Sequence, residues 1–162
     1  MESWVNLAKL SSPEGTAERM SHSHVCCLVH LVFATAERRP VIRDEIKERL
    51  HSYLGGIARE NGISALAVSG TADHVHLLIS LPRSIAVAKA VQLLKSGSSK
   101  WVHENFPESK SFAWQEGYGA FSIGVSQIPT TVRYIQSQTE HHKRISFTDE
   151  LKKFLAVHEI KE

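Results

Sequence analysis

The hydrophobic pattern of the first half of the chain alternates short strand-like runs with one longer helical repeat. Residues 25–34 (VCCLVHLVFA) are nearly all apolar, as expected of a central strand that is covered on both faces. Residues 43–60 place apolar side chains at helical spacing and stop at an Asn-Gly pair, which predicts an amphipathic helix. Residues 63–69 and 75–81 predict two further strands joined by a tight turn.

The second half of the chain predicts helices around one aromatic-rich hairpin. Ser84 is placed to cap a helix that runs to about residue 105. Residues 112–125 combine aromatic side chains with glycines that supply turn conformations, which predicts a β-hairpin. Helical periodicity then predicts a helix over residues 128–142. A short amphipathic helix over residues 147–156 would cover apolar surface of this chain or of a second subunit.

Length and composition indicate one compact domain behind a flexible leader. A chain of 162 residues can bury a single core. Residues 1–23 mix Ser, Pro, Gly and charge without periodicity and predict the leader, which leaves residues 24–162 as the domain. The 19 Lys and Arg residues barely exceed the 17 Asp and Glu residues, so any contact with nucleic acid must be local.

No segment of the sequence indicates a membrane or a secreted protein. The apolar runs fall well short of the roughly 20 residues of a membrane-spanning helix, and the N-terminus has no apolar core of a signal peptide. Cys26 and Cys27 are adjacent in an apolar run, where they would point to opposite sides of a strand, so a disulfide between them is disfavoured. We therefore expect a soluble, cytoplasmic protein.

Two histidines at the start of the third predicted strand form the first candidate site. His74 and His76 flank one β-branched residue, and alternating strand side chains would send both imidazoles to the same face. Such a pair can bind a metal ion but needs a third ligand, and it is equally consistent with two polar residues on a sheet face. Asp73 is placed to orient a metal-bound histidine, although a turn aspartate is the simpler interpretation. His30 is interpreted as a hydrogen-bonded core histidine.

Small hydroxyl and basic residues gather in the middle of the helix predicted before residue 105. Three serines, Ser98 among them, and a glycine between Lys95 and Lys100 weaken the helix, but small hydroxyls and cations suit a phosphate chain that lies close to the backbone. A solvated polar face is the alternative interpretation. Arg38 and Arg39 follow the first strand and are further candidates for phosphate contacts, although each alone is more simply an ordinary surface cation.

The helix predicted over residues 128–142 holds the second candidate site. Tyr134 and Gln138 are four residues apart, so a phenol and an amide lie side by side on one rigid element. The order of elements and motifs along the chain resembles one family. A strand, a helix and a strand come first, followed by the His-x-His strand and the Leu-Lys-x-x-Ser-Ser helix. The Trp-Gln-x-Gly-Tyr-Gly-Ala-Phe-Ser segment and the Tyr-x-x-x-Gln helix follow. This family is the single-tyrosine transposases of small bacterial insertion sequences, which belong to the HUH nucleases. The resemblance covers about residues 27–155 and lies in the combination of motifs.

The resemblance implies a fold, a chemistry and partners. The fold would be α+β, a ferredoxin-like antiparallel sheet sandwiched by helices. His74, His76 and Gln138 would hold a divalent ion, Mg²⁺ or Mn²⁺, and Tyr134 would be the nucleophile that cuts one DNA strand and becomes joined to its 5′ phosphate. Tyr118 is the alternative nucleophile, but its Gly-Tyr-Gly setting indicates a turn. The family acts as a homodimer on single-stranded DNA with hairpin ends.

Two other classes of function remain open from the sequence. The first is a domesticated protein that grips single-stranded or hairpin DNA without cutting it, which the presence of Tyr134 and the histidine pair argues against. The second is an unrelated metal enzyme, such as a cupin-like oxygenase that uses His-x-His. That alternative predicts a nearly all-β protein, whereas the downstream half of this sequence predicts helices.

Overall fold

A computed structural model describes residues 23–138 and 145–160 of the chain. The predicted leader, residues 1–23, therefore lies outside the described residues apart from its last residue. The predicted helix 128–142 also runs into the second gap.

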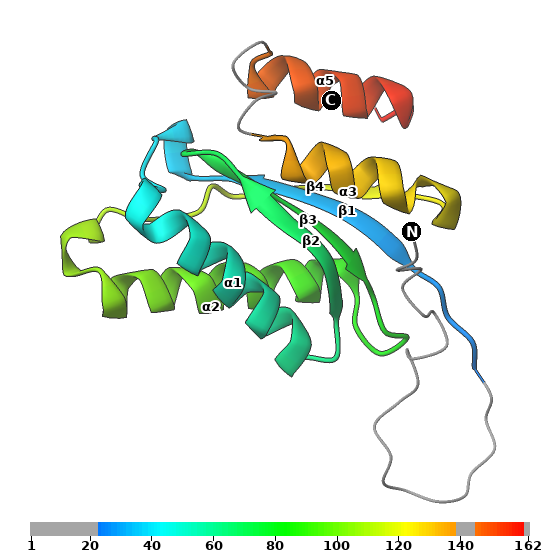
Figure 1. Ribbon diagram of the computed structural model, residues 1–162, viewed down its shortest axis with the longest axis horizontal. Coiled ribbons are helices and arrows are strands. Elements are labelled where there is room, and N and C mark those ends of the chain that lie inside the picture. Colours follow the sequence, from blue (N-terminus) through cyan, green and yellow to red (C-terminus); the bar gives the residue numbers. More distant parts are fainter. Residues whose placement is uncertain (1–22, 139–144, 161–162) are drawn as a thin grey trace, which may run out of the picture.

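Four strands form one antiparallel sheet at the centre of the structure (Figure 1). They are β1 (Leu28–Ala34), β2 (Ser64–Gly70), β3 (His74–Ser80) and β4 (Gly119–Ser122), in the spatial order β2-β3-β1-β4. Helix α1 (Asp44–Glu60) connects β1 to β2, and helix α2 (Val87–Asn105) connects β3 to β4. This β-α-β-β-α-β order with an antiparallel sheet is the ferredoxin-like arrangement, and it confirms the predicted fold class.

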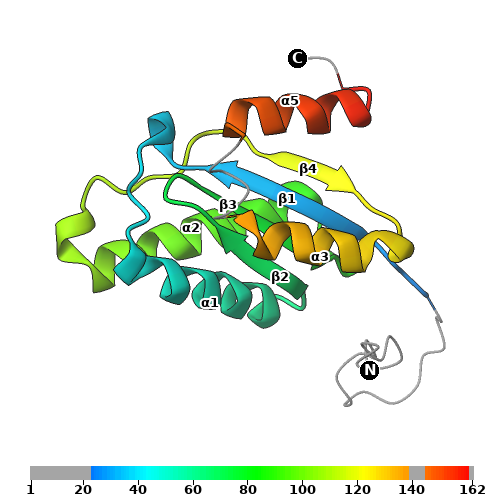
Figure 2. The ribbon, with the colours of Figure 1, turned by 45° about the horizontal axis from the view of Figure 1, so that its top comes forward.

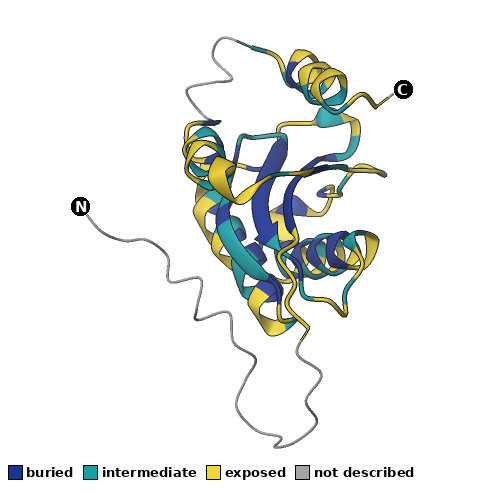
Figure 3. Cartoon of the chain, turned by 90° about the vertical axis from the view of Figure 1, so that its right-hand side faces the viewer, coloured by how far each residue is buried: buried dark blue, intermediate teal, exposed yellow. Residues whose placement is uncertain are grey.

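Helices cover both faces of the sheet. In the view of Figure 1, α1 and α2 lie below the sheet, whereas α3 (Ile128–Gln136) and α5 (Phe147–Val157) lie above it. Figure 2 shows α5 on the side of β4, with α3 on the side of β2. The strands are largely buried between these layers and the outer helix faces are exposed (Figure 3). This mixture of sheet and helix excludes the nearly all-β alternative.

Strand β3 divides its side chains between the two layers. Its odd-numbered residues belong to the large apolar cluster beneath α1 and α2, which contains Val75, Leu77 and Ile79. Its even-numbered residues face the other layer, where Leu78 packs with Ile135 of α3. His74 and His76 share this face and are both buried, so the prediction that the two imidazoles leave one face of the sheet is confirmed.

Two predicted element boundaries differ from the structure. Helix α2 begins at Val87 with Ala86 as its N-cap, so Ser84 does not cap it. The reason is a turn before the helix, in which the Ile85 amide donates to the carbonyl of Pro82 at 3.3 Å. Strand β1 begins at Leu28 and not at residue 25, which leaves the two preceding cysteines exposed with free thiols.

The predicted hairpin over residues 112–125 is wrong. Only β4 forms in this segment, and it pairs with β1. Trp114 makes an isolated bridge with Thr35, one residue past the end of β1. Trp114 and β4 thus lie along the same edge, which β1 and Thr35 form, and do not pair with each other. The residues between Trp114 and β4 form a loop. Gly117 has the positive φ (80°) of a turn glycine, whereas Gly119 lies within β4.

The described helices contain no segment that is both long and apolar enough to cross a membrane. Helix α3 ends at Gln136 with Ser137 as its C-cap, and the predicted range from residue 139 onward lies outside the described residues. Helix α5 spans nearly the predicted range, and the Ser146 hydroxyl caps it by accepting from the Asp149 amide at 3.2 Å.

Gly70, at the end of β2, is required by the close approach of the next strand. A Cβ at this position would collide with the carbonyl oxygen of His74. We expect Gly70→Ala to destabilise the fold by about 2 kcal/mol or more because the backbone must shift. Gly56 of α1 has open space around it, so Gly56→Ala is the matched control and should raise stability by up to about 1 kcal/mol. Urea unfolding measures both, and a Gly70→Ala protein as stable as the wild type would contradict this account.

Candidate active site

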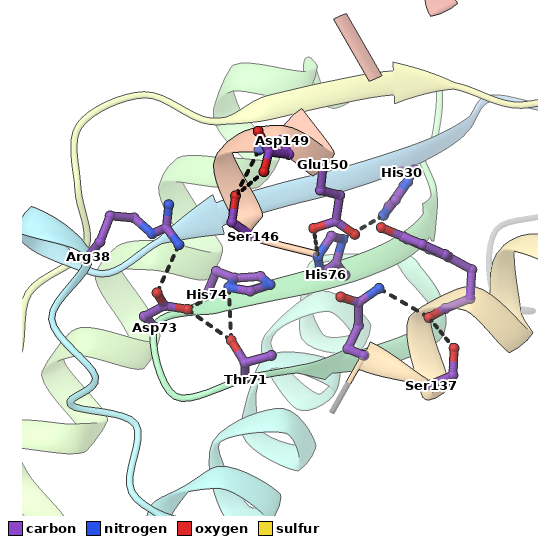
Figure 4. A network of polar contacts seen from close by, with 12 residues as sticks. His30, Arg38, Thr71, Asp73, His74, His76, Ser137, Ser146, Asp149 and Glu150 are labelled. Atoms are coloured by element: carbon purple, nitrogen blue, oxygen red, sulfur yellow. Dashed lines mark hydrogen bonds and ion pairs between the residues drawn. The ribbon is translucent and has the colours of Figure 1, made fainter. Parts of the chain in front are cut away.

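Three buried side chains from two distant elements meet above the sheet (Figure 4). His74 and His76 come from β3, and Glu150 comes from α5. One ligand atom from each lies within 4.8 Å of the other two, which is the geometry of a site that could hold a metal ion. The Nε2 atom of His76 is 3.7 Å from Oε2 of Glu150.

His74 is held in place by the turn that precedes it. Its Nδ1 atom lies 2.7 Å from Oδ1 of Asp73 and 2.8 Å from the Thr71 hydroxyl. The other oxygen of Asp73 accepts from the Arg38 guanidinium at 2.8 Å. Partial burial alone would raise the pKa of Asp73, but hydrogen bonds from His74, Arg38 and Thr71 hold it well below its usual value. Asp73 is thus more than a turn residue, because as a carboxylate it fixes the orientation of the His74 imidazole through Nδ1.

His76 is held in place from the neighbouring strand. Its Nδ1 atom lies 2.9 Å from Nε2 of His30 on β1, and both rings are buried. Burial, reinforced by His76 and by His158, lowers the pKa of His30 to about 3, so its imidazole is neutral. The interpretation of His30 as a hydrogen-bonded core histidine agrees with this geometry, and its partner is a candidate ligand.

Glu150 is a candidate metal ligand that the sequence reasoning missed. Burial raises the pKa of its carboxyl to about 7, although His74, Arg38 and Lys153 oppose the shift. The Glu150 side chain is only 4% exposed and lies beside two imidazoles. A buried carboxylate in such surroundings is a candidate for binding a cation. The signal in the sequence was its position: Glu150 lies three residues after Phe147 and four before Phe154, on the apolar stripe of α5.

The same stripe of α5 covers the rest of the site. Phe147 packs against the His74 ring with centroids 4.6 Å apart, and Phe154 packs edge-on against Tyr134 at 5.8 Å. The predicted apolar face of this helix therefore covers its own sheet, and it brings Glu150 into contact with the histidine pair.

Tyr134 lies next to the histidine pair of its own chain. Its ring centroid is 5.8 Å from that of His76 and 6.0 Å from that of His30. Together with His30, Glu150 and Phe154 it lines a cavity of about 380 Å³. The structure therefore brings the phenol and the histidine pair together within one chain.

Gln138 is fully buried one turn after Tyr134. Its amide nitrogen donates to the Tyr134 carbonyl at 3.1 Å. Its Oε1 atom is buried without a hydrogen-bond partner among the described residues, which is unusual for an acceptor unless a further ligand completes it. Imidazole nitrogens, a carboxylate and an amide oxygen together fit a divalent ion such as Mg²⁺ or Mn²⁺.

The residues predicted to contact phosphate fall into two groups. Some already form hydrogen bonds within the protein, and others are exposed. Lys95 donates to the carbonyls of Gln115 and Gly117 and so holds the loop before β4. Ser98 is fully buried, where its hydroxyl donates to the Leu94 carbonyl at 2.6 Å and accepts from Trp114 at 2.9 Å. Both side chains are therefore used inside the protein in this structure.

The other three candidate cations differ in their distance from the site. Arg38 adjoins it, since its guanidinium pairs with Asp73 and lies 4.0 Å from the centre of the Phe147 ring. Arg39 and Lys100 are exposed, with side chains 49% and 76% accessible. They remain available to a charged partner, but the described residues give them no contact with the histidine pair.

Known proteins resemble this chain in sequence over most of its length. Residues 23–138 match the family model for IS200-like transposases. Over 134 residues the chain is 27% identical to the transposase of insertion sequence IS200 from Salmonella typhimurium, which covers 80% of this chain and 88% of the relative. It is also 27% identical over 114 residues to the ISDra2 transposase TnpA of Deinococcus radiodurans, covering 67% of this chain and 81% of that protein.

Two solved structures share the fold. One is a candidate transposase from Deinococcus radiodurans R1, with a TM-score of 0.59, 24% identity, and coverage of 75% of this chain and 98% of that one. The other is a REP-associated tyrosine transposase bound to a REP hairpin, with a TM-score of 0.57, 15% identity, and coverage of 80% and 76%. The fold and the matched sequence define a transposase. This chain belongs to the IS200-like transposase family, as its motifs predicted.

Glu150 offers a test of the metal site. We expect Glu150→Gln to weaken Mn²⁺ binding by tenfold or more, because the amide removes the negative charge between the two imidazoles. Calorimetric titration of the full chain with Mn²⁺, without DNA, measures the affinity. Glu104→Gln on the exposed end of α2 is the matched control and should bind as the wild type does. Equal affinity in both variants would remove Glu150 from the site.

Proposed function

We propose that this chain cuts and rejoins single-stranded DNA by transesterification through a covalent 5′-phosphotyrosine, with Tyr134 as the nucleophile. The observation that supports the proposal best is the position of Tyr134, whose ring lies 5.8 Å from His76 on the sheet face that also carries His74. A nucleophile next to a candidate cation site is what attack on an anionic phosphodiester requires.

The bond changes in the proposed reaction balance without an external energy source. The phenol of Tyr134 loses its proton, and its oxygen bonds to phosphorus as the bond from phosphorus to the 3′ oxygen breaks. The 3′ oxygen leaves with a proton as a hydroxyl, and the downstream strand stays attached to the protein through its 5′ phosphate. Attack by a second 3′ hydroxyl reverses these changes on a new strand. One phosphodiester replaces another, so no ATP is needed.

A divalent ion would supply charge neutralisation at the phosphate. His74, His76 and Glu150 would hold it, and Gln138 is a further candidate because its buried Oε1 lacks a partner among the described residues. When bound, such an ion polarises a non-bridging oxygen and stabilises developing charge. The residues of the chain itself fix the ligands and exclude water, since all four side chains are buried.

The proposed substrate is single-stranded DNA with a hairpin. One structural neighbour of this chain was solved bound to a REP hairpin, which supports this class of substrate. The exposed Arg39 and Lys100 are candidates for contacts with its phosphates. The homodimer implied by the family remains a prediction. Because Tyr134 and the histidine pair adjoin within one chain, we propose that the tyrosine acts on the site of its own subunit.

A non-cleaving DNA-binding protein is the second candidate. One observation favours it, namely that the hydroxyl oxygen of Tyr134 is buried in this structure. DNA must reach that oxygen for the reaction to occur. The two candidates differ in a covalent product that one of them cannot form.

The covalent adduct is the decisive prediction for Tyr134. Incubation with labelled single-stranded hairpin DNA and Mn²⁺ should give an adduct that survives a denaturing gel. The adduct should be lost in Tyr134→Phe, because the nucleophilic oxygen is gone, with at least a thousandfold lower yield. Tyr118→Phe is the matched control, since Tyr118 is a 44% exposed tyrosine that the sequence offered as the alternative nucleophile.

The possible outcomes separate the candidates. An adduct that persists in Tyr134→Phe and vanishes in Tyr118→Phe would transfer the role to Tyr118. Hairpin binding without an adduct in the wild type, at any Mn²⁺ concentration, would favour the non-cleaving protein.

A further inference from the structure

His30 occupies a position that the proposed reaction does not itself use. It lies on β1 opposite Leu78 of β3, so it is the diagonal neighbour of His76 on the same face of the sheet. Its Nε2 atom lies 2.9 Å from Nδ1 of His76, and the ring is only 2% exposed. Figure 4 shows this pair beside Glu150, with His30 on the side of His76 away from His74.

We propose that His30 is a positioning residue that holds His76 in the tautomer and orientation required to bind a metal ion through Nε2. This inference rests on the metal-dependent reaction proposed above. It assigns a role to a residue that lies outside the ligand set and does not touch the reacting atoms.

The tautomer argument follows from the chemistry of neutral imidazole. Such a ring carries one N–H and one lone pair, so a histidine that binds a metal through Nε2 must carry its proton on Nδ1. The Nδ1 proton of His76 needs an acceptor, because both rings are buried. Nε2 of a neutral His30 is that acceptor, and His30 then carries its own proton on Nδ1. The Nε2 atom of His76 points toward Glu150, 3.7 Å away.

Packing fixes the His30 ring in this role. Phe154 lies edge-on against it with centroids 5.1 Å apart, and Phe121 lies on another side at 6.5 Å. The His30 and His76 rings are 5.1 Å apart and tilted by 31°. A ring enclosed in this way has little freedom to turn from its partner. Hydrogen bonds from such outer groups typically change metal affinity by about 10- to 100-fold.

The two candidate ligands from β3 are oriented by different chemistry. His74 is paired with a carboxylate, Asp73, which is itself held by Arg38. His76 is paired with a neutral acceptor from the next strand. The neutral partner adds no second negative charge to a buried region that already contains Glu150, whose desolvation is unfavourable.

Paired substitutions at His30 separate positioning from packing. His30→Gln can present an amide oxygen near the place of Nε2, whereas His30→Met keeps a similar length but accepts only weakly. His51 of α1 is the matched control, because it is also a histidine with a buried Nε2 atom but belongs to the helix layer on the opposite face. His51→Met should leave the site unchanged.

Mn²⁺ affinity of the full chain, measured by calorimetry without DNA, is the first readout. We expect His30→Met to bind Mn²⁺ at least tenfold more weakly than the wild type, and His30→Gln to remain within about threefold. Nitrogen-15 shifts of the labelled histidines give the second readout. They should report His76 protonated on Nδ1 in the wild type and in His30→Gln, and a mixture of tautomers in His30→Met.

Each outcome decides the proposal. Wild-type affinity in His30→Met would overturn it, as would an equal loss in His30→Met and His30→Gln, because packing alone would then explain the effect. If His30→Met fails to fold, His30→Asn takes its place, since its side chain is too short to reach His76 and must also lose affinity. A wild type that binds no Mn²⁺ and forms no DNA adduct would overturn the proposed function itself, and this inference with it.

Discussion

The alternation of side chains along β3 is the constraint on which the rest of the structure depends. Residues 75, 77 and 79 point into the apolar cluster beneath α1 and α2, and residues 74, 76 and 78 point to the other face. A slip of one residue in the pairing of β3 would exchange the two faces and bury the imidazoles among leucines and valines. The burial of Val75, Leu77 and Ile79 opposes the slip and holds the register in which β3 pairs on both sides. The geometry of the site is therefore inherited from the register of the sheet.

Three levels of structure then complete the site. The turn before β3 supplies Asp73, which is adjacent in sequence to the histidine that it holds. The neighbouring strand supplies His30, which is 46 residues away from His76 in sequence. The two helices on the same face supply Tyr134 and Glu150, each set by the packing of a whole element. Each level depends on the one before it, because the helices can only dock on a sheet whose face is already defined.

The sequence alone predicted the contacts between residues close in sequence, but not those between residues far apart in sequence. A period of two residues was enough to place His74 and His76 on one face, and a spacing of four was enough to align Tyr134 with Gln138 on one helix. Glu150 was missed because nothing near it in sequence resembles a ligand set, and only the docking of α5 brings it to His76. The hairpin error has the same origin. Turn glycines were visible locally, but the competing partner strand lies more than 80 residues earlier.

The two faces of the sheet also separate the source of stability from the source of chemistry. Apolar burial stabilises a fold by about 25 cal/mol per Å², and here most of it lies beneath α1 and α2. On the opposite face the buried apolar core is small, and imidazoles, an amide and a carboxylate take much of the space. Each buried polar group costs about 1–3 kcal/mol where it lacks a good partner. The large apolar cluster beneath α1 and α2 offsets part of that cost.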